Sequence, residues 1–485
     1  MSVTESKPRP WLAGVVLLCV VLATISELPH LHDDVWQDEA ATLMVFAAHG
    51  VGEAFRNYSM PNNHMLFSAT LSLWWSRGDS VMHARLLPAL VWWVATALMV
   101  VTGRRQLGWP ATALAVALWS GSALVAAFQF GLRGYAFSWP FTLVLFAACQ
   151  RFIVDGERRA APLIACAGIA SIAILPSNVM VLAVCVGAAL LRAVLAQGAL
   201  RARHLLYSAI AAGLGLLGVL VYLPHRAELQ QHMHNGFSHW SAVEVVSHWL
   251  LASSAPYWPL APLLVFGAWR LVRGAEVDRR DGQAALALLA SLALVMPFAV
   301  LSSPTPLVPR ALVPLLPLWC LAMGGVLAPA VSALAQRARW AVLPALAGVA
   351  LLCFALGRVM PACDGANWRF PVGDDLCHQY YRQDYRPDAL LRAIDTQFGG
   401  EAVLVEPGTL WPLAFVQWNH GLRHARVRDV GQWPRGPYAP RPALLVSDTP
   451  AHGLALLARV TAARPRALAQ VLDSGVLKLY AVRWQ

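Results

Sequence analysis

Two adjacent carboxylates, Asp38 and Glu39, lie in a short polar segment soon after the first apolar run, residues 11–28. Only 13% of the residues are charged and 58% are hydrophobic, so an acidic pair beside a membrane-length segment needs a reason. Low-dielectric surroundings raise the pKa of a carboxylate toward that of a useful base, and a nearby arginine keeps it ionised. Because neighbouring side chains on a loop cannot face one point, one could act as a base and the other as an orienting group. The alternatives are a solvated loop, or a helix near Ala41 that is capped by Asp38.

Three arginines lie at the predicted outer ends of apolar runs: Arg85, Arg133 and Arg310. A guanidinium close to hydrocarbon is costly unless it pairs with another group or binds an anion. Its planar fork matches phosphate bidentately, so three such residues on the same side as an acidic pair indicate a lipid-phosphate substrate. The alternative for each arginine is that its side chain extends to the lipid headgroups.

Amide and imidazole groups occur where the chain returns to the membrane, at Asn62, Asn63 and His64. These groups can hydrogen-bond sugar hydroxyls or phosphate, although a turn followed by a helix cap would use the same residues. His64 could also hold a divalent cation together with Asp38 and Glu39. No cofactor follows with certainty from the sequence.

The elements that must position these residues are mostly membrane helices. The mean hydropathy is +0.53, and the 485 residues contain more apolar sequence than a soluble core can use. Apolar runs that match the hydrocarbon core predict about eleven spans: 11–28, 81–102, 110–130, 135–152, 160–176, 178–195, 205–224, 256–273, 283–302, 311–328 and 340–358. A twelfth apolar run, 64–75, is short for a span, so we expect it to lie in the membrane interface or to re-enter it.

Basic residues in the short loops indicate the topology, because Lys and Arg favour the cytoplasmic side. If 64–75 does not cross, the outer loop 29–80 contains the acidic pair, and the C-terminus also lies outside. The net charge of +11 is then mostly a topology signal and does not indicate nucleic-acid binding. The predicted cytoplasmic basic residues are Lys7, Arg9, Arg104, Arg105, Arg151, Arg158, Arg159, Arg192, Arg201, Arg203, Arg270, Arg273, Arg279, Arg280, Arg337 and Arg339.

The chain changes character near residue 358, which predicts a transmembrane domain over 1–358 and a soluble α/β domain on the outer side over 359–485. Cys363 and Cys377 lie in the second part, where a disulfide would contribute about 3 kcal/mol. Within the membrane part, the His-rich segment 224–248 is predicted to be a solvated loop packing over a cleft. Periodicity in the C-terminal part predicts strands at 402–406 and 442–447, helices at 387–398 and 451–463, and a hairpin at 472–482.

Five short motifs within residues 1–358 resemble, in their types and in their order along the chain, the motifs of GT-C glycosyltransferases. The nearest relatives by this resemblance are bacterial enzymes akin to the protein O-mannosyltransferases and to the aminoarabinose transferase of lipid A. The motifs are Trp36-x-Asp38-Glu39, Pro61-Asn62-Asn63-His64-Met65-Leu66, Arg85-Leu86-Leu87-Pro88-Ala89-Leu90, Arg133-Gly134-Tyr135 and Pro309-Arg310-Ala311-Leu312-Val313-Pro314-Leu315-Leu316-Pro317.

The resemblance implies an α-helical polytopic membrane protein of GT-C type. We expect about eleven transmembrane helices plus interfacial helices, a small C-terminal periplasmic α/β domain, and a place in the bacterial inner membrane. The implied reaction moves a sugar from a polyprenyl-phosphate donor to a hydroxyl of a glycan, lipid or protein at the periplasmic face, with inversion at the anomeric carbon. The alternatives are a lipid-diphosphate-dependent glycan ligase or polymerase, and a polytopic transporter or flippase.

The resemblance also implies roles for individual residues. In the family the first acidic residue of the loop is the base, here Asp38, and Glu39 would orient the acceptor or a cation. The leaving phosphate needs charge stabilisation, which suits the arginines. The expected contacts to donor phosphate and sugar are Asn62, Asn63, His64, Arg85, Arg133, Tyr135 and Arg310. Two motifs depart from the family pattern, which often has Lys-Pro-Pro at 62–64 and Arg-Tyr at 310–311.

Overall fold

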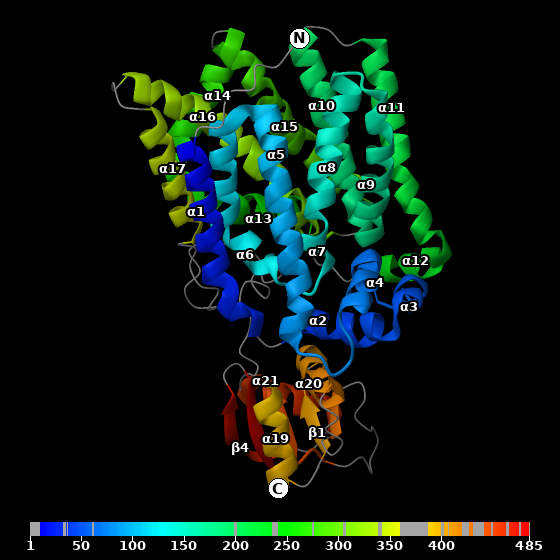
Figure 1. Ribbon diagram of the computed structural model, residues 1–485. Helices are drawn as coiled ribbons and strands as arrows, with labels where there is room; N and C mark the ends of the chain where they lie inside the picture. Colours follow the sequence, from blue (N-terminus) through cyan, green and yellow to red (C-terminus); the bar gives the residue numbers. More distant parts are fainter. Residues whose placement is uncertain are drawn as a thin grey trace. The chain divides into compact units, whose positions relative to one another are not determined.

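The computed structural model (Figure 1) shows a helical protein with a small β-sheet near its C-terminus. The chain divides into two compact units. Unit 1 comprises 1–28, 58–67 and 87–381, and unit 2 comprises 29–57, 68–86 and 382–485. The structure describes residues 10–32, 35, 37–60, 63–197, 201–234, 241–273, 276–303, 307–337, 342–358, 387–398, 402–405, 407–419, 426–429, 441–447, 450–461, 465–474 and 477–484.

Unit 1 is a bundle of apolar helices. Among the described helices that are long enough to span a membrane, the segment that contains α16 is the most buried. Helices α14 and α15 instead expose large apolar side chains such as Val265, Leu294 and Phe298, as expected of lipid-facing positions. The helices are α1 Pro10–Glu27, α5 Val81–Gly121, α6 Ala123–Gln129, α7 Gly134–Phe137, α8 Trp139–Cys149, α9 Ala161–Ile174, α10 Val179–Gln197, α11 Ala202–Leu216, α12 Arg226–His234, α13 Ala242–Ser254, α14 Ala261–Arg273, α15 Glu276–Leu301, α16 Leu316–Arg337 and α17 Val342–Arg358.

Eight helical segments within the described residues are long and apolar enough to cross a membrane. The eleven runs that the sequence predicts as spans all lie mainly in helices. The structure nevertheless has three fewer membrane-length segments than predicted runs, for two reasons. Two runs join in the 41-residue α5, which is interrupted at Gly108, where a φ of +79° requires glycine. The other two, α9 and α17, have only 14 and 17 residues.

Helix α4, Met65–Trp74, corresponds to the run that was expected not to cross. Its 10 residues extend about 15 Å, half of the hydrocarbon thickness. The prediction of a loop over 224–248 is wrong within the described residues, since α12 and α13 occupy most of it. A capping box formed by Ser241 and Glu244 begins α13.

Unit 2 contains a five-stranded mixed sheet in the order β2-β1-β3-β5-β4. The parallel strands are β1 Ala402–Val405, β2 Arg426–Asp429 and β3 Leu444–Ser447, and the antiparallel hairpin is β4 Pro465–Ser474 with β5 Leu477–Trp484. Helix α21, Pro450–Val460, buries Leu457 against Leu404 and Leu445 of the sheet. Helices α19 Pro387–Phe398 and α20 Pro407–Asn419 complete this part.

The rest of unit 2 comes from the first loop. A short turn, η1 Leu28–His32, is followed by α2 Gln37–Ala41, the π-helical turn η2 Thr42–Phe46, η3 Ala47–His49 and α3 Val51–Arg56. Helix α20 packs against α2. Its aromatic residues Phe415 and Trp418 lie against Trp75 at ring distances of 6.4 and 6.3 Å. Residues 382–485 therefore share a compact unit with residues 29–57, the segment that carries the acidic pair.

Candidate active site

The acidic pair lies in the first turn of α2, where negative charge suits the positive end of the helix dipole. Glu39 is only 4% exposed, and its Oε2 accepts a hydrogen bond of 2.9 Å from Nη2 of Arg85. Arg85 is 2% exposed and also donates from Nη1 to the carbonyl of His30 at 3.3 Å. This buried ion pair joins α2 to the first turns of α5 and fixes the orientation of Glu39.

Asp38 is partly exposed, in contrast to its neighbour. Its backbone carbonyl accepts a hydrogen bond of 2.9 Å from Oγ1 of the buried Thr42. Because α2 begins at Gln37, Asp38 lies inside the helix and is not the cap of a helix near Ala41. The two carboxylates thus have different surroundings.

The turn between α4 and α5 binds the end of α20. Nε and Nη2 of Arg77 donate to the carbonyl of Trp418 at 3.2 and 2.8 Å, and the guanidinium lies 4.7 Å from the Trp418 ring. The backbone N–H of Gly78 donates to Oδ1 of Asn419 at 2.8 Å. These contacts connect the C-terminal residues to the turn that precedes Arg85.

A second cluster lies in unit 1, around the loop between α6 and α7. Arg133 precedes α7 and is 2% exposed, with its guanidinium 5.5 Å from the ring of Tyr135. The imidazole of His64, 1% exposed, meets the Tyr135 ring edge-to-face at 4.8 Å. Phe128 packs against the same ring at 5.3 Å, and Asn63 is also buried. Two motifs separated in sequence therefore converge here.

Gly134 makes this convergence possible. A Cβ at this position would lie 2.6 Å from Nδ1 of His64 and 2.6 Å from Cγ2 of Ile174. Real side chains do not tolerate such distances, so the Arg133-Gly134-Tyr135 motif requires a residue without a side chain. The glycine brings the backbone of α7 directly against the imidazole.

His64 is held as a neutral imidazole. Burial lowers its pKa well below the usual value of 6.5, and the positive charges of Arg133 and Arg310 lower it further. Its Nδ1 makes no hydrogen bond to any residue that the structure describes. A neutral ring can present either a donor or an acceptor to a ligand.

Arg310 is half-buried and lies in the 3-10 segment η9, Pro309–Leu315. Trp139 Nε1 of α8 donates to the carbonyl of Val313 at 3.1 Å, and Thr142 Oγ1 donates to that of Pro314 at 3.2 Å. Through these bonds α8 contacts the backbone of η9. They hold the segment that carries Arg310.

Sequence reasoning missed the residues that support α7. Nδ2 of the buried Asn178 donates to Oγ of Ser138 at 2.9 Å, and Ser138 Oγ donates to the carbonyl of Gly134 at 3.1 Å. The signal that could have indicated this role is the Pro176-Ser177-Asn178 turn between two apolar runs.

The structure thus places the predicted residues in two clusters, one in each unit: Asp38, Glu39 and Arg85 in unit 2, and Asn63, His64, Arg133, Tyr135 and Arg310 in unit 1. Asn62 lies outside the described residues, as does the predicted Cys363–Cys377 disulfide. Within the described part of the chain, no group of three His, Cys, Asp or Glu residues could hold a metal ion.

Sequence comparisons found no relative of this protein, whereas comparison with solved structures found proteins of similar architecture. No family model matches the sequence, and no curated protein matches it. The structure is similar to ArnT from Cupriavidus metallidurans in the apo state, with a TM-score of 0.56 and 14% identity over 97% of this chain and 98% of that chain. For ArnT bound to undecaprenyl phosphate, the TM-score is 0.54 with 15% identity over 96% and 98% of the two chains.

The molecule is a multi-pass membrane protein with the fold of the GT-C glycosyltransferases, the class to which ArnT belongs. The predicted fold class is confirmed.

Proposed function

We propose that this protein is an inverting glycosyltransferase. It moves a sugar from a polyprenyl-phosphate donor to a hydroxyl of a glycan, lipid or protein at the periplasmic face of the bacterial inner membrane. The observation that carries the proposal is the contrast on α2, where Glu39 is fixed in a buried ion pair while Asp38 stays partly exposed. The shared fold supports it, since one similar structure is that of ArnT bound to undecaprenyl phosphate.

In this reaction the carboxylate of Asp38 accepts the proton of the acceptor hydroxyl. The acceptor oxygen forms a bond to the anomeric carbon while the bond from that carbon to the phosphate oxygen breaks. The products are the glycosylated acceptor, with inverted configuration, and polyprenyl phosphate. A phosphate leaving group requires charge stabilisation more than it requires a proton.

The cluster in unit 1 supplies that stabilisation in this proposal. Arg133 and Arg310 bind the phosphate, because two guanidinium groups match its charge and its geometry. His64 contacts a phosphate or sugar oxygen, and burial keeps it from adding a third positive charge. Asn62, Asn63 and Tyr135 are assigned to the sugar or the phosphate, as the sequence predicts.

Arg85 receives a different assignment from the one that its position in the sequence suggests. Phosphate binding by Arg85 stays a prediction, but the bond to Glu39 favours a positioning role. Arg85 holds Glu39, and Glu39 orients the acceptor beside Asp38. The arginine then acts through the carboxylate.

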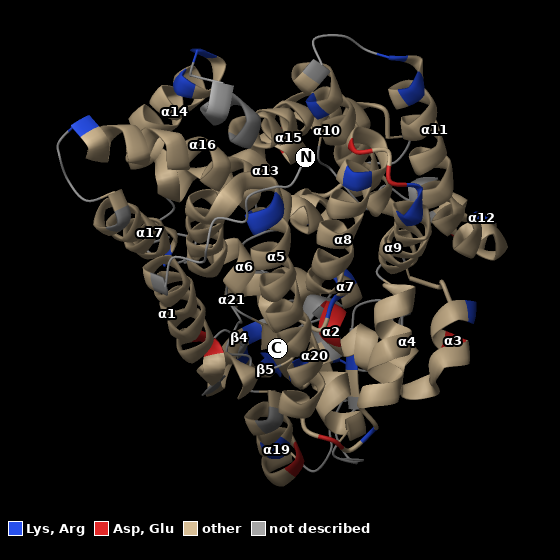
Figure 2. Cartoon of the chain, turned by 45° about the horizontal axis from the view of Figure 1, so that its top comes forward, with Lys and Arg blue, Asp and Glu red and all other residues tan. Residues whose placement is uncertain are grey.

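The orientation of the protein is also part of the proposal. Arg270 and Arg273 lie in the last turn of α14, and Arg337 lies in the last turn of α16. Figure 2 shows Lys and Arg at the ends of α10, α11 and α14 as well. Basic residues that follow several spans support a cytoplasmic location for these ends.

The test is to identify the lipid released by the purified protein. Reconstituted protein is supplied with membrane lipid extract, and the products are analysed by mass spectrometry. We expect polyprenyl monophosphate together with a glycosylated acceptor of inverted configuration. Release of a diphosphate would favour the ligase alternative, and movement of the lipid without covalent transfer would favour a transporter; either result contradicts the proposal.

A further inference from the structure

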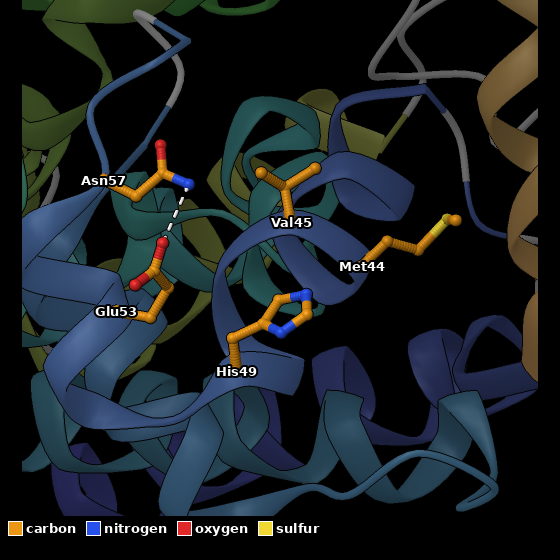
Figure 3. Close-up of a pocket in the computed structure, with 5 residues that line it drawn as sticks. All are labelled: Met44, Val45, His49, Glu53 and Asn57. Carbon is orange, nitrogen blue, oxygen red and sulfur yellow. Dashed lines mark hydrogen bonds between the residues drawn. The ribbon is translucent and has the colours of Figure 1, made fainter.

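A pocket of about 510 Å³ opens in unit 2 on the segment that follows the acidic helix. Its lining residues are Met44 and Val45 of η2, His49 of η3, Glu53 of α3 and Asn57 just after α3. In Figure 3, Glu53 and Asn57 lie on one side of the pocket and Met44 lies on the other. Sites for small molecules in proteins commonly have volumes of this order.

The polar side of the pocket is ordered by a hydrogen bond. Nδ2 of Asn57 donates to Oε1 of Glu53 at 3.2 Å, which fixes the orientation of both planar groups (Figure 3). Carboxylate and amide groups accept hydrogen bonds from hydroxyls, and the imidazole of His49 adds a group that can donate or accept. The pocket thus offers several polar groups at defined positions.

The other side of the pocket is apolar. Met44 and Val45 provide a surface against which the C–H face of a sugar ring can pack. Among the lining residues that the structure describes there is no Lys or Arg, and Glu53 would repel an anion. The pocket therefore suits a neutral polyhydroxyl ligand and does not suit the phosphate of the donor.

The pocket belongs to the same helical segment as the acidic pair. Helix α2 continues directly into η2, so Met44 follows Asp38 by six residues, roughly 9 Å along a helix axis. Glu39, Leu43 and Phe46 are buried, whereas Asp38 and Val45 remain partly exposed. Met44 and Val45 themselves belong to the π-helical turn η2, a feature that often marks functional sites.

We propose that this acceptor pocket, defined by Met44, Val45, His49, Glu53 and Asn57, binds the neutral sugar whose hydroxyl is glycosylated. The inference rests on the proposed function and extends it by assigning the acceptor a carbohydrate structure and a binding site. Glu53 and Asn57 bind hydroxyl groups of this sugar, and Met44 and Val45 contact its ring.

The experiment measures binding of neutral methyl hexopyranosides to the full-length protein in lipid nanodiscs, by saturation-transfer-difference NMR. We expect at least one glycoside of the panel to bind, and its 6-phosphate to bind more weakly. Glu53→Gln should weaken binding about tenfold, since a hydrogen bond to a charged group has that effect. Arg56→Ala is the matched control, because Arg56 is exposed on the same helix and does not line the pocket.

A second variant, Val45→Trp, fills the pocket and should abolish binding even if Glu53→Gln folds poorly. The proposal is overturned if no neutral glycoside binds, or if both pocket variants bind as the wild type does. Competition by a neutral glycolipid in the nanodisc would assign the bound sugar to a lipid, and its absence would assign the sugar to a soluble or protein-borne glycan. Either outcome supports a carbohydrate site.

Failure of the proposed function gives a different result. If glycosides bind to the pocket but the wild type releases no polyprenyl monophosphate from lipid extract, the transfer reaction is contradicted and the carbohydrate site is not. If transfer occurs and Glu53→Gln leaves the acceptor KM unchanged, the pocket assignment fails and the reaction stands. The expected result is a KM increase of about tenfold with a smaller change in kcat.

Discussion

Arg85 and Arg133 have the same exposure, 2%, and the sequence predicts the same phosphate-binding role for both, but their surroundings differ. Arg85 lies against the carboxylate of Glu39 at 2.9 Å. Arg133 lies beside the Tyr135 ring, and its charge acts, with that of Arg310, on the buried imidazole of His64. In the first environment a carboxylate accepts a hydrogen bond from the guanidinium, whereas in the second two guanidinium charges act on one neutral imidazole. The comparison suggests that Arg85 stabilises the acidic helix and that Arg133 serves an anionic ligand.

The largest expected effect on stability follows from breaking the buried pair. Arg85→Met leaves the Glu39 carboxylate buried without its cation, which should lower the free energy of unfolding by about 3–5 kcal/mol. Chemical unfolding of the detergent-solubilised protein measures this. The double variant Arg85→Met, Glu39→Gln should recover much of the loss, because no charge is then left uncompensated. Unchanged stability of the single variant would show that the pair does not hold α2.

The second prediction distinguishes Arg133 from Arg85 by an effect on turnover. Arg133→Met should reduce kcat by about 10²–10³ through lost stabilisation of the leaving phosphate, with a smaller loss of stability than Arg85→Met causes. Release of polyprenyl phosphate gives the rate. Arg151→Met is the control, because this exposed arginine pairs with Glu157 in the loop after α8. Wild-type turnover of Arg133→Met would remove the distinction between the two arginines.

A smaller effect tests the contact that assembles the unit 1 cluster. Gly134→Ala introduces a Cβ within 2.6 Å of His64 and Ile174, and such overpacking costs about 1–3 kcal/mol. Gly213→Ala is the matched control, since no atom lies within 4 Å of the added Cβ. In the interior of α11 this change should stabilise the helix by roughly 0.5–1 kcal/mol. Equal effects of the two variants on unfolding would contradict the close packing.

The smallest effect is the pH dependence of stability due to His64. Its folded-state pKa is lowered, so below about pH 6.5 the unfolded chain binds a proton that the folded protein does not. Stability should therefore fall as the pH drops through that range, by at most about 1.4 kcal/mol per pH unit. His64→Gln should reduce this slope, measured by unfolding between pH 5 and pH 7. An identical slope in the variant would mean that His64 is not held neutral.

Local patterns in the sequence predicted elements better than they predicted contacts. The predicted helix 387–398 matches α19, and the predicted strand 442–447 contains β3, because apolar periodicity reports directly on which residues are buried. Helix α20 was missed, since Pro412 and a nearly uniform apolar composition obscure its period. Strand β2 was missed because Arg426 and Arg428 alternate with only one apolar residue between them.

In the candidate site, too, the sequence predicted individual residues but not the contacts between them. The sequence identified Arg85 and Glu39 separately, but their pairing spans 46 residues and depends on tertiary structure. Likewise, the position of Gly134 against His64 follows from the packing of α7, which no local pattern encodes. The capping box at Ser241 could have been predicted from the spacing of serine and glutamate and would have corrected the loop assigned to 224–248.

The most direct test of the central claim compares Asp38→Asn with Asp155→Asn in the release of polyprenyl phosphate by the reconstituted protein. Asp155 follows α8 and its π-helical turn, outside the α2 segment. Loss of a general base should reduce turnover by about 10²–10⁴, while unfolding and donor binding remain near those of the wild type, and Asp155→Asn should retain activity. Full transfer by folded Asp38→Asn would contradict the account, because the partly exposed carboxylate of α2 would then not be the base.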